Sequence, residues 1–305
     1  DDMGKKFTIG VLIGNVHTAH PKDLIRGIRA AASGMDVNVI YFLGTQSVRF
    51  NQKFALEDFD YQYNTVYDYA KLAKVDVLII AYGSLCIFQK NEDKQAFLDK
   101  FAGIPYVLLE DATDDPRGIY VMVDNFGGMQ KCVEHLIIEH HLKHLVYLGG
   151  PEDNQDAIER KAAFLNVMAE HHLPVTPEMM AVGDYSEFVD NLVEQLLKDN
   201  PDAEAIISAN DEMTVACYRV CKAHGLRIGK DILITGFDDV ERARYSNPPL
   251  TTVSQDAYKM GQIAVEKAVD ICAGRPEESV RLDAELIIRE SCGCKVTRRA
   301  KEKAD

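Results

Sequence analysis

The chain has 305 residues, 47% hydrophobic and 27% charged, which suits a globular protein of two lobes. Its formal net charge of −14 opposes binding of this chain to nucleic-acid phosphates. No apolar run approaches the ~20 residues that span a bilayer, and the first residues lack the apolar segment of a secretory signal. The seven cysteines are odd in number and scattered, which favours free thiols and a cytoplasmic location.

Short β-branched, apolar runs recur along the chain and predict strands buried on both faces. Helical patterns lie between most of them, at 125–139, 155–172, 185–200 and 211–225, and Gly225 suits the end of the last helix. This alternation predicts an α/β fold with parallel sheets covered by helices, and the chain length favours two sheets over one. The predicted strands are 7–14, 37–43, 75–82, 104–109, 119–123, 144–150, 204–208, 231–237 and 285–289.

The segment 44–64 interrupts this alternation. It contains five aromatic residues and has weak periodicity. We expect a long loop or a small excursion, of the kind that carries function or covers an interface.

Polar side chains follow five of the predicted strands. Because the carboxyl ends of parallel strands meet at one edge, where open α/β sheets bind ligands, we expect a polar cleft there. The adjacent acids Asp238 and Asp239 could hold a metal, act in acid–base catalysis, contact a polar ligand or serve as turn residues. Further carboxylates and a recognisable nucleophile–base pair are lacking, which favours a ligand contact. The strand-end residues are Asn15 and His17, Tyr82 and Ser84, Glu110 and Asp111, Asn210 and Asp211, and Asp238 and Asp239.

Two groups of potential metal ligands occur in the sequence. His140 and His144 have the i, i+4 spacing of zinc ligands on a helix, but a strand starts at His144, so a polar helix end is the preferred interpretation. Cys292 and Cys294 in "SCGC" are too close for a normal tetrahedral pair, and no second pair accompanies them, which favours a structural role. No nucleotide-binding loop is present. We therefore expect no cofactor, no metal and no catalytic residue.

The pieces "VDN", "HLI", "GGP", "AND", "GFDD" and "PPLTT" occur in this order within residues 121–164 and 205–256. With their spacing, they resemble the effector-binding core of lac/galactose-repressor-type regulators, and the resemblance covers nearly the whole chain. It implies a fold like that of periplasmic binding proteins: two doubly wound parallel-sheet lobes joined by three crossings, with a ligand between them. The implied parts are 7–123 plus 254–281, 124–253 plus 282–294, and a tail at 295–305.

The resemblance also implies ligand contacts. Arg160 in "AIERKAAF" and Asp238 would hold ligand hydroxyls, with Asn210 beside them, Tyr185 in "GDYSEF" stacking on the ligand and Gln255 at the second crossing. An Arg donor fork and an Asp acceptor pair suit a sugar or a related polyol, and an aromatic face covers the apolar face of a sugar ring. The strand-end residues Asn15, His17, Tyr82 and Glu110 complete the expected contacts.

Family cores pair through their first lobes, so the resemblance implies a homodimer, with helix 21–34 and segment 44–64 as its apolar surface. Family repressors carry a DNA-binding head, but here the first strand starts at Phe7, and the ending "IIRESCGC" resembles sensor variants of the fold. We therefore expect a cytoplasmic sensor of a small molecule that reaches DNA only through a fused domain and has no membrane partner. The alternatives are a sugar- or nucleoside-active enzyme and a transport binding protein.

His140 stands where the family has glycine. Either the backbone of His140 must adopt a left-handed conformation, or the helix before it must end differently.

Overall fold

The structure is a computed structural model that describes residues 6–45, 60–86 and 91–295. Most of the predicted excursion at 44–64 therefore lies outside the described residues. The chain divides into two compact units: unit 1 comprises 1–125, 151–159 and 256–284, and unit 2 comprises 126–150, 160–255 and 285–305. Residues 151–159 group with unit 1, whereas the sequence analysis placed them in the second lobe.

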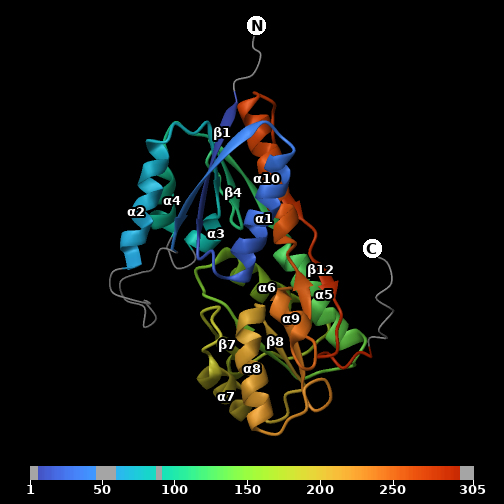
Figure 1. Ribbon diagram of the computed structural model, residues 1–305. Coiled ribbons are helices and arrows are strands. Elements are labelled where there is room, and N and C mark those ends of the chain that lie inside the picture. The colour runs from blue at the N-terminus through green and yellow to red at the C-terminus, as the bar shows by residue number, and fades with distance from the viewer. Residues whose placement is uncertain (1–5, 46–59, 87–90, 296–305) are drawn as a thin grey trace. The chain divides into compact units, whose positions relative to one another are not determined.

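Unit 1 is a six-stranded parallel sheet in the order β11-β5-β4-β3-β1-β2, with helices on both faces (Figure 1). Its strands are β1 (Phe7–Gly14), β2 (Val37–Gly44), β3 (Val77–Ile80), β4 (Tyr106–Leu109), β5 (Gly118–Val123) and β11 (Val280–Leu282). Its helices are α1 (Ala19–Ser33), α2 (Thr65–Asp68), α3 (Tyr82–Leu85), α4 (Asn91–Asp99) and α10 (Ala257–Cys272), with short 3₁₀ turns η1 (Asp60–Asn64) and η2 (Tyr69–Lys71).

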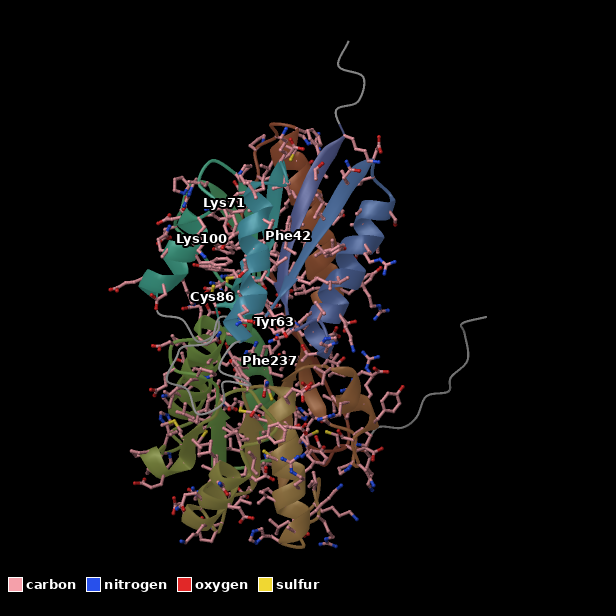
Figure 2. All side chains as sticks on the ribbon, turned by 60° about the vertical axis from the view of Figure 1, so that its left-hand side comes forward. Phe42, Tyr63, Lys71, Cys86, Lys100 and Phe237 are labelled. Atoms are coloured by element: carbon pink, nitrogen blue, oxygen red, sulfur yellow. The ribbon has the colours of Figure 1, made fainter. Side chains whose placement is uncertain are left out.

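The core of unit 1 follows from the period of two along its strands. Alternate residues such as Leu78 and Ile80 point toward α2, α3 and α4, where Phe42 and Cys86, both labelled in Figure 2, join the same buried cluster. Phe97 of α4 packs edge-on against Tyr67 and Phe101 in this cluster. The central strands β3 and β4 are buried on both faces, which explains why their sequences are continuously apolar rather than alternating.

Helices α1 and α10 lie side by side on unit 1, and two glycines allow their backbones to touch (Figure 1). A Cβ at Gly27 would come within 1.9 Å of the Tyr258 carbonyl oxygen, and one at Gly261 within 2.4 Å of the Leu24 carbonyl oxygen. The apolar stripe of α1, including Leu24 and Ile28, is fully buried. This stripe packs within its own unit, and the contribution of helix 21–34 to a dimer surface stays a prediction, carried by residues outside the stripe such as half-buried Ile25 and exposed Ala30.

Unit 2 is a second six-stranded sheet, in the order β12-β10-β9-β8-β6-β7, parallel except for the antiparallel pair β10–β12. Helix α8 packs on β8 and β9, α7 packs on α8, and α6 packs on β6 through stacked Phe164 and Tyr147 rings. The strands are β6 (Leu145–Gly149), β7 (Met180–Val182), β8 (Ala205–Ser208), β9 (Leu233–Asp238), β10 (Thr251–Ser254) and β12 (Glu285–Ile287). The helices are α5 (Asn125–Ile138), α6 (Gln155–Glu170), η3 (Pro177–Met179), α7 (Asp190–Asp199), α8 (Asp211–Ala223) and α9 (Glu241–Tyr245).

The predicted fold class and all nine predicted strands are confirmed. Three strands, β7, β10 and β11, were not predicted; β10 reads "TTVS" and β11 reads "VRL", so neither is a continuous apolar run. Helix α7 begins at Asp190 rather than at 185, since Tyr185 has a positive φ of 67°. At the end of α5 the left-handed residue is His141, with φ 58°, rather than His140.

The α1–α10 crossing predicts the effect of adding one methyl group. Gly27→Ala must separate the two helices, and overpacking of this kind costs about 1–3 kcal/mol of unfolding free energy. Gly34→Ala, at the end of the same helix, is the matched control, because its Cβ meets nothing nearer than 3.6 Å. Chemical denaturation followed by circular dichroism measures both. Equal stability of the two variants would contradict the close crossing.

Candidate functional site

Arg160 of α6 is the most constrained polar residue of unit 2. Its side chain is 2% exposed, although the guanidinium group is always charged. Nη1 donates to the Ala209 carbonyl oxygen at 2.7 Å and lies 3.6 Å from Asp238 Oδ1. The guanidinium carbon lies 3.8 Å from the ring centre of Phe237, which Figure 2 labels. These contacts offset the cost of burying the charge and fix the group at the carboxyl ends of β8 and β9.

The adjacent acids Asp238 and Asp239 at the end of β9 have different partners. Asp238, with φ 121°, accepts a hydrogen bond from Gln255 Nε2 and faces Arg160. Asp239 Oδ1 accepts from Arg289 Nη2 at 2.6 Å, and its Oδ2 accepts from Arg244 Nη2 at 3.2 Å. Asp239 therefore fastens the turn after β9, while Asp238 belongs to the polar edge that carries Arg160.

Asn210 and Tyr185 belong to the same edge of unit 2. Asn210 Oδ1 accepts from the Met213 amide at 3.0 Å and caps α8, and its Nδ2 donates to the Tyr185 carbonyl oxygen at 3.1 Å. The Tyr185 ring lies so close to Gly150 that a Cβ there would meet ring carbons at 2.4 Å. The glycine of "GGP" thus allows the aromatic ring to occupy this position.

Asp211, next to Asn210, has a structural role. Its carboxylate accepts hydrogen bonds from Thr252 Oγ1 at 2.6 Å and from the Val240 amide at 3.0 Å. Burial, followed by the nearby charge of Asp238, raises the pKa of Asp211 above its usual range. The side chain connects the start of α8 to β10 and to the turn after β9.

In unit 1, Glu110 follows β4 with φ 69° and is buried. Its carboxylate pairs with His20 Nε2 and accepts from the amide and hydroxyl of Ser84. Burial alone would raise the pKa of Glu110, but the attraction of His20 and the bonds from His20 and Ser84 outweigh it, so the pKa is lowered. Both carboxylate oxygens of Glu110 thus bond to residues of unit 1, and the side chain connects α1, which carries His20, to α3, which carries Ser84.

The other residues of unit 1 that were expected to contact a ligand lie at positions of different exposure. Asn15, with φ 50°, turns the chain after β1, and its carbonyl accepts from the Thr18 amide and hydroxyl; His17 beside it is exposed. Tyr82 lines a pocket of about 640 Å³ whose wall includes the buried ion pair of Lys94 Nζ and Asp111 Oδ2, 2.7 Å apart. The pocket is lined by Tyr82, Lys94, Gln95, Asp111, Ala112, Thr113, Asp114, Asp115 and Gln155.

The structure therefore brings Arg160, Tyr185, Asn210, Asp238 and Gln255 to one edge of unit 2. Sequence reasoning missed His20 as the partner of Glu110, because the two residues lie 90 positions apart and no pattern links them. It also missed Lys94. This lysine stands among other charged residues in the sequence, so nothing indicates that it is buried beside Asp111.

Comparisons with known proteins agree with this architecture. Residues 133–292 match the family of periplasmic binding protein-like domains. The HTH-type transcriptional regulator CelR of Thermobifida fusca is 30% identical over 216 residues, which are 68% of this chain and 62% of CelR. The chain thus spans less than two thirds of that relative.

Two solved structures share the fold. A transcriptional regulator CelR–cellobiose complex matches with a TM-score of 0.77 and 23% identity, over 93% of this chain and 84% of that one. The lac repressor dimer bound to operator and the anti-inducer ONPF matches with a TM-score of 0.78 and 23% identity, over 95% of this chain and 82% of the repressor chain.

Fold and site together match an effector-binding domain of the kind found in ligand-sensing regulators. The chain belongs to the family of periplasmic binding protein-like domains. The expected periplasmic-binding-protein-like family is confirmed, and the relatives that match this chain are transcription regulators. Among the described residues, no helix combines the length and the apolar character needed to cross a membrane.

The lowered pKa of Glu110 predicts a dependence of stability on pH. A depressed carboxyl pKa stabilises the fold above the unfolded pKa of about 4.3, and this contribution is lost as the pH falls below it. Glu110→Gln should therefore lower the unfolding free energy by about 1–3 kcal/mol near neutral pH, and the difference from the parent protein should shrink below about pH 4.3.

Denaturant titrations at several pH values test this dependence. Asp36→Asn is the control, because Asp36 pairs with Lys6 while its side chain is 83% exposed, and such a surface change stays within about 0.5 kcal/mol. A Glu110→Gln effect that is the same at pH 7 and pH 4 would show that an ionised Glu110 is not what stabilises unit 1.

Proposed function

We propose that this chain is the ligand-sensing domain of a transcription regulator and that its effector is a sugar or a related polyol. The observation that carries the proposal is the buried Arg160 guanidinium, held between Phe237 and Asp238 at the carboxyl edge of the unit 2 sheet. Burying a charge costs free energy unless the charge is paired and hydrogen-bonded, and ligand hydroxyls could add to the pairing that Asp238 and Ala209 give. Its donors and the Asp238 acceptors are the groups that pair with vicinal hydroxyls.

The neighbours of this pair complete a sugar-like surface. The Tyr185 ring offers an apolar face of the kind that covers the C–H face of a sugar ring. Asn210 and Gln255 bring amide groups that both donate and accept. The relative CelR supports this class of ligand, because a solved CelR complex contains cellobiose. Asn15, His17 and Tyr82 remain proposed contacts on unit 1, whereas Glu110 acts by holding the local structure.

The regulator is proposed to work in the cytoplasm as a homodimer and to contact DNA through a segment other than the described residues. The lac repressor in the matched structure is a dimer bound to operator. The net charge of −14 supports the separation of DNA contact from this domain. Because the α1 stripe is buried within unit 1, we place the dimer contact on edge strand β2, whose Ile40 and Leu43 are exposed.

The effector assignment predicts weakened binding when the charged pair is changed. A thermal-shift screen of mono- and disaccharides including cellobiose, with nucleosides as a comparison set, identifies a ligand for calorimetry. Asp238→Asn and Arg160→Ala should then each weaken binding by about five- to 150-fold, because a lost hydrogen bond to a buried ligand costs about 1–3 kcal/mol.

The exposed pair Arg227 and Asp231, 2.6 Å apart, supplies matched controls. Arg227→Ala and Asp231→Asn should bind as the parent protein does. Circular dichroism confirms that each variant is folded, and Asp238→Asn remains informative if Arg160→Ala unfolds. Parent-like affinity in Asp238→Asn would remove Asp238 from the site, and stabilisation by nucleosides alone would overturn the sugar class.

The dimer proposal predicts a mass of twice the chain mass of 34.1 kDa in light scattering at micromolar concentration. Leu43→Glu places a charge on the proposed contact and should give monomers, whereas Leu72→Glu, at an exposed leucine after η2, should leave the dimer intact. A monomeric parent protein at high micromolar concentration would contradict the dimer, and a dimeric Leu43→Glu variant would exclude β2.

A further inference from the structure

Unit 2 contains a cluster of two imidazoles and two thiols that the effector site does not use. His135 lies in the last turn of α5, and His140 lies just beyond the end of this helix. Cys292 and Cys294 lie in the segment after β12, more than 150 positions away in the sequence. One ligand atom from each of the four side chains lies within 4.8 Å of all the others.

The spacing of these atoms fits a tetrahedral zinc ion. The edge of a tetrahedron is about 1.6 times the distance from its centre to a corner, so Zn–N bonds of about 2.05 Å and Zn–S bonds of about 2.3 Å require edges of about 3.3 Å for N–N and about 3.6 Å for S–N. The two histidine Nε2 atoms are 3.3 Å apart, and Cys294 Sγ lies 3.6 Å from His135 Nε2 and 3.4 Å from His140 Nε2. All three measured edges agree with coordination geometry.

The helix end positions the two histidines. The Leu142 amide donates to the Leu136 carbonyl oxygen at 3.3 Å, and His141 before Leu142 has φ 58°, so a left-handed residue ends the helix here. The chain thus reverses directly after His140 and brings its ring to 5.0 Å from the His135 ring, centre to centre. A helix that continued through 140 would carry the two imidazoles away from each other, since five positions turn about 140° past a full turn.

The cysteine side of the cluster is fastened to the sheet. Buried Ser291 donates through Oγ to the Ile234 carbonyl oxygen at 2.6 Å, and the Thr251 amide donates to the same Oγ at 2.8 Å. Gly293 has φ 86°, a conformation that favours glycine, and it turns the chain so that both thiols face the histidines. "CGC" therefore forms a tight turn that carries two thiols, and the second ligand pair comes from the last turn of α5 and the residue His140 beyond it.

The protonation states are compatible with coordination. Burial lowers the pKa of His135, with His140 adding to the effect, and burial likewise lowers the pKa of His140, so both imidazoles are neutral near physiological pH. Burial and the neighbouring Cys292 raise the pKa of Cys294 to about 11, so a metal ion must displace its proton, as zinc does when it binds cysteine.

We propose that His135, His140, Cys292 and Cys294 form a structural zinc site. Two thiolates and two imidazoles are a ligand set typical of zinc, and four protein ligands leave no open position for a substrate. The ion would join the end of α5 to the segment after β12. The site lies outside the polar edge of Arg160 and Asp238, so its role is to stabilise unit 2.

The first test is metal content. Protein purified under reducing conditions should carry about one zinc per chain by inductively coupled plasma mass spectrometry, as expected for a closed four-ligand site. Removal of the metal with a chelator should lower the melting temperature, and added Zn²⁺ should restore it. Apo-protein titrated with Co²⁺ should develop the visible bands of tetrahedral cobalt and a thiolate charge-transfer band.

Variants assign the ligands. Cys294→Ser and His140→Ala should lose the cobalt bands and the melting shift with Zn²⁺, whereas Cys272→Ser and His172→Ala, changes at a cysteine and a histidine outside the cluster, should retain both. The spectrum of the parent protein decides the question even if a variant fails to fold.

Three outcomes would overturn the proposal: no zinc bound and no cobalt spectrum in the reduced parent protein, unchanged metal binding in Cys294→Ser, or a Cys292–Cys294 disulfide in protein isolated under anaerobic conditions.

Discussion

The polar edge of unit 2 depends on the burial of one guanidinium group. Arg160 is charged and 2% exposed, so the surrounding chain must supply acceptors and a polarisable surface. The carbonyl of Ala209 after β8, the carboxylate of Asp238 after β9 and the ring of Phe237 meet this demand. Strand order, the left-handed turn at Asp238 and the position of α6 must all agree for these groups to converge. A misplaced element would leave a buried cation without partners, so the same interaction specifies the fold and presents the donors of the proposed effector site.

Much of the fold could be predicted from the sequence, because it depends on local patterns. Runs such as "VLII" in β3 are apolar throughout because the strand is buried on both faces, and all nine predicted strands therefore appear in the structure. The missed strands are three or four residues long. Strand β10, for instance, reads "TTVS", and its two threonines are buried although their side chains are polar. They are buried because Thr252 donates to Asp211 and Thr251 accepts from the Arg289 amide, contacts that no periodicity encodes.

The site was predictable to the extent that it lies at strand ends. Parallel strands place their carboxyl ends together, so Asp238 and Asn210 could be assigned to one edge from their positions alone. The separate roles of Asp238 and Asn210 could not be predicted, because each role depends on bonding partners that are distant in the sequence. The partners of Glu110, for example, are His20 and Ser84, and nothing in its position after a strand indicates either of them. Likewise, "CGC" lacks a second ligand pair in the sequence, and only the reversal at His141 brings two imidazoles to it.

The two chemical centres of unit 2 occupy opposite ends of one strand. Ser291, between the cysteine ligands and β12, is bonded to Ile234 near the start of β9, whereas Asp238 ends that strand. Four residues of strand separate these points by about 13 Å. Two thiolates cancel the charge of a zinc ion, so the proposed metal exerts little field on the Arg160–Asp238 pair. The metal would then affect effector binding only by making β9 and α5 more rigid. The metal site would thus stabilise the sheet that carries the effector-binding residues.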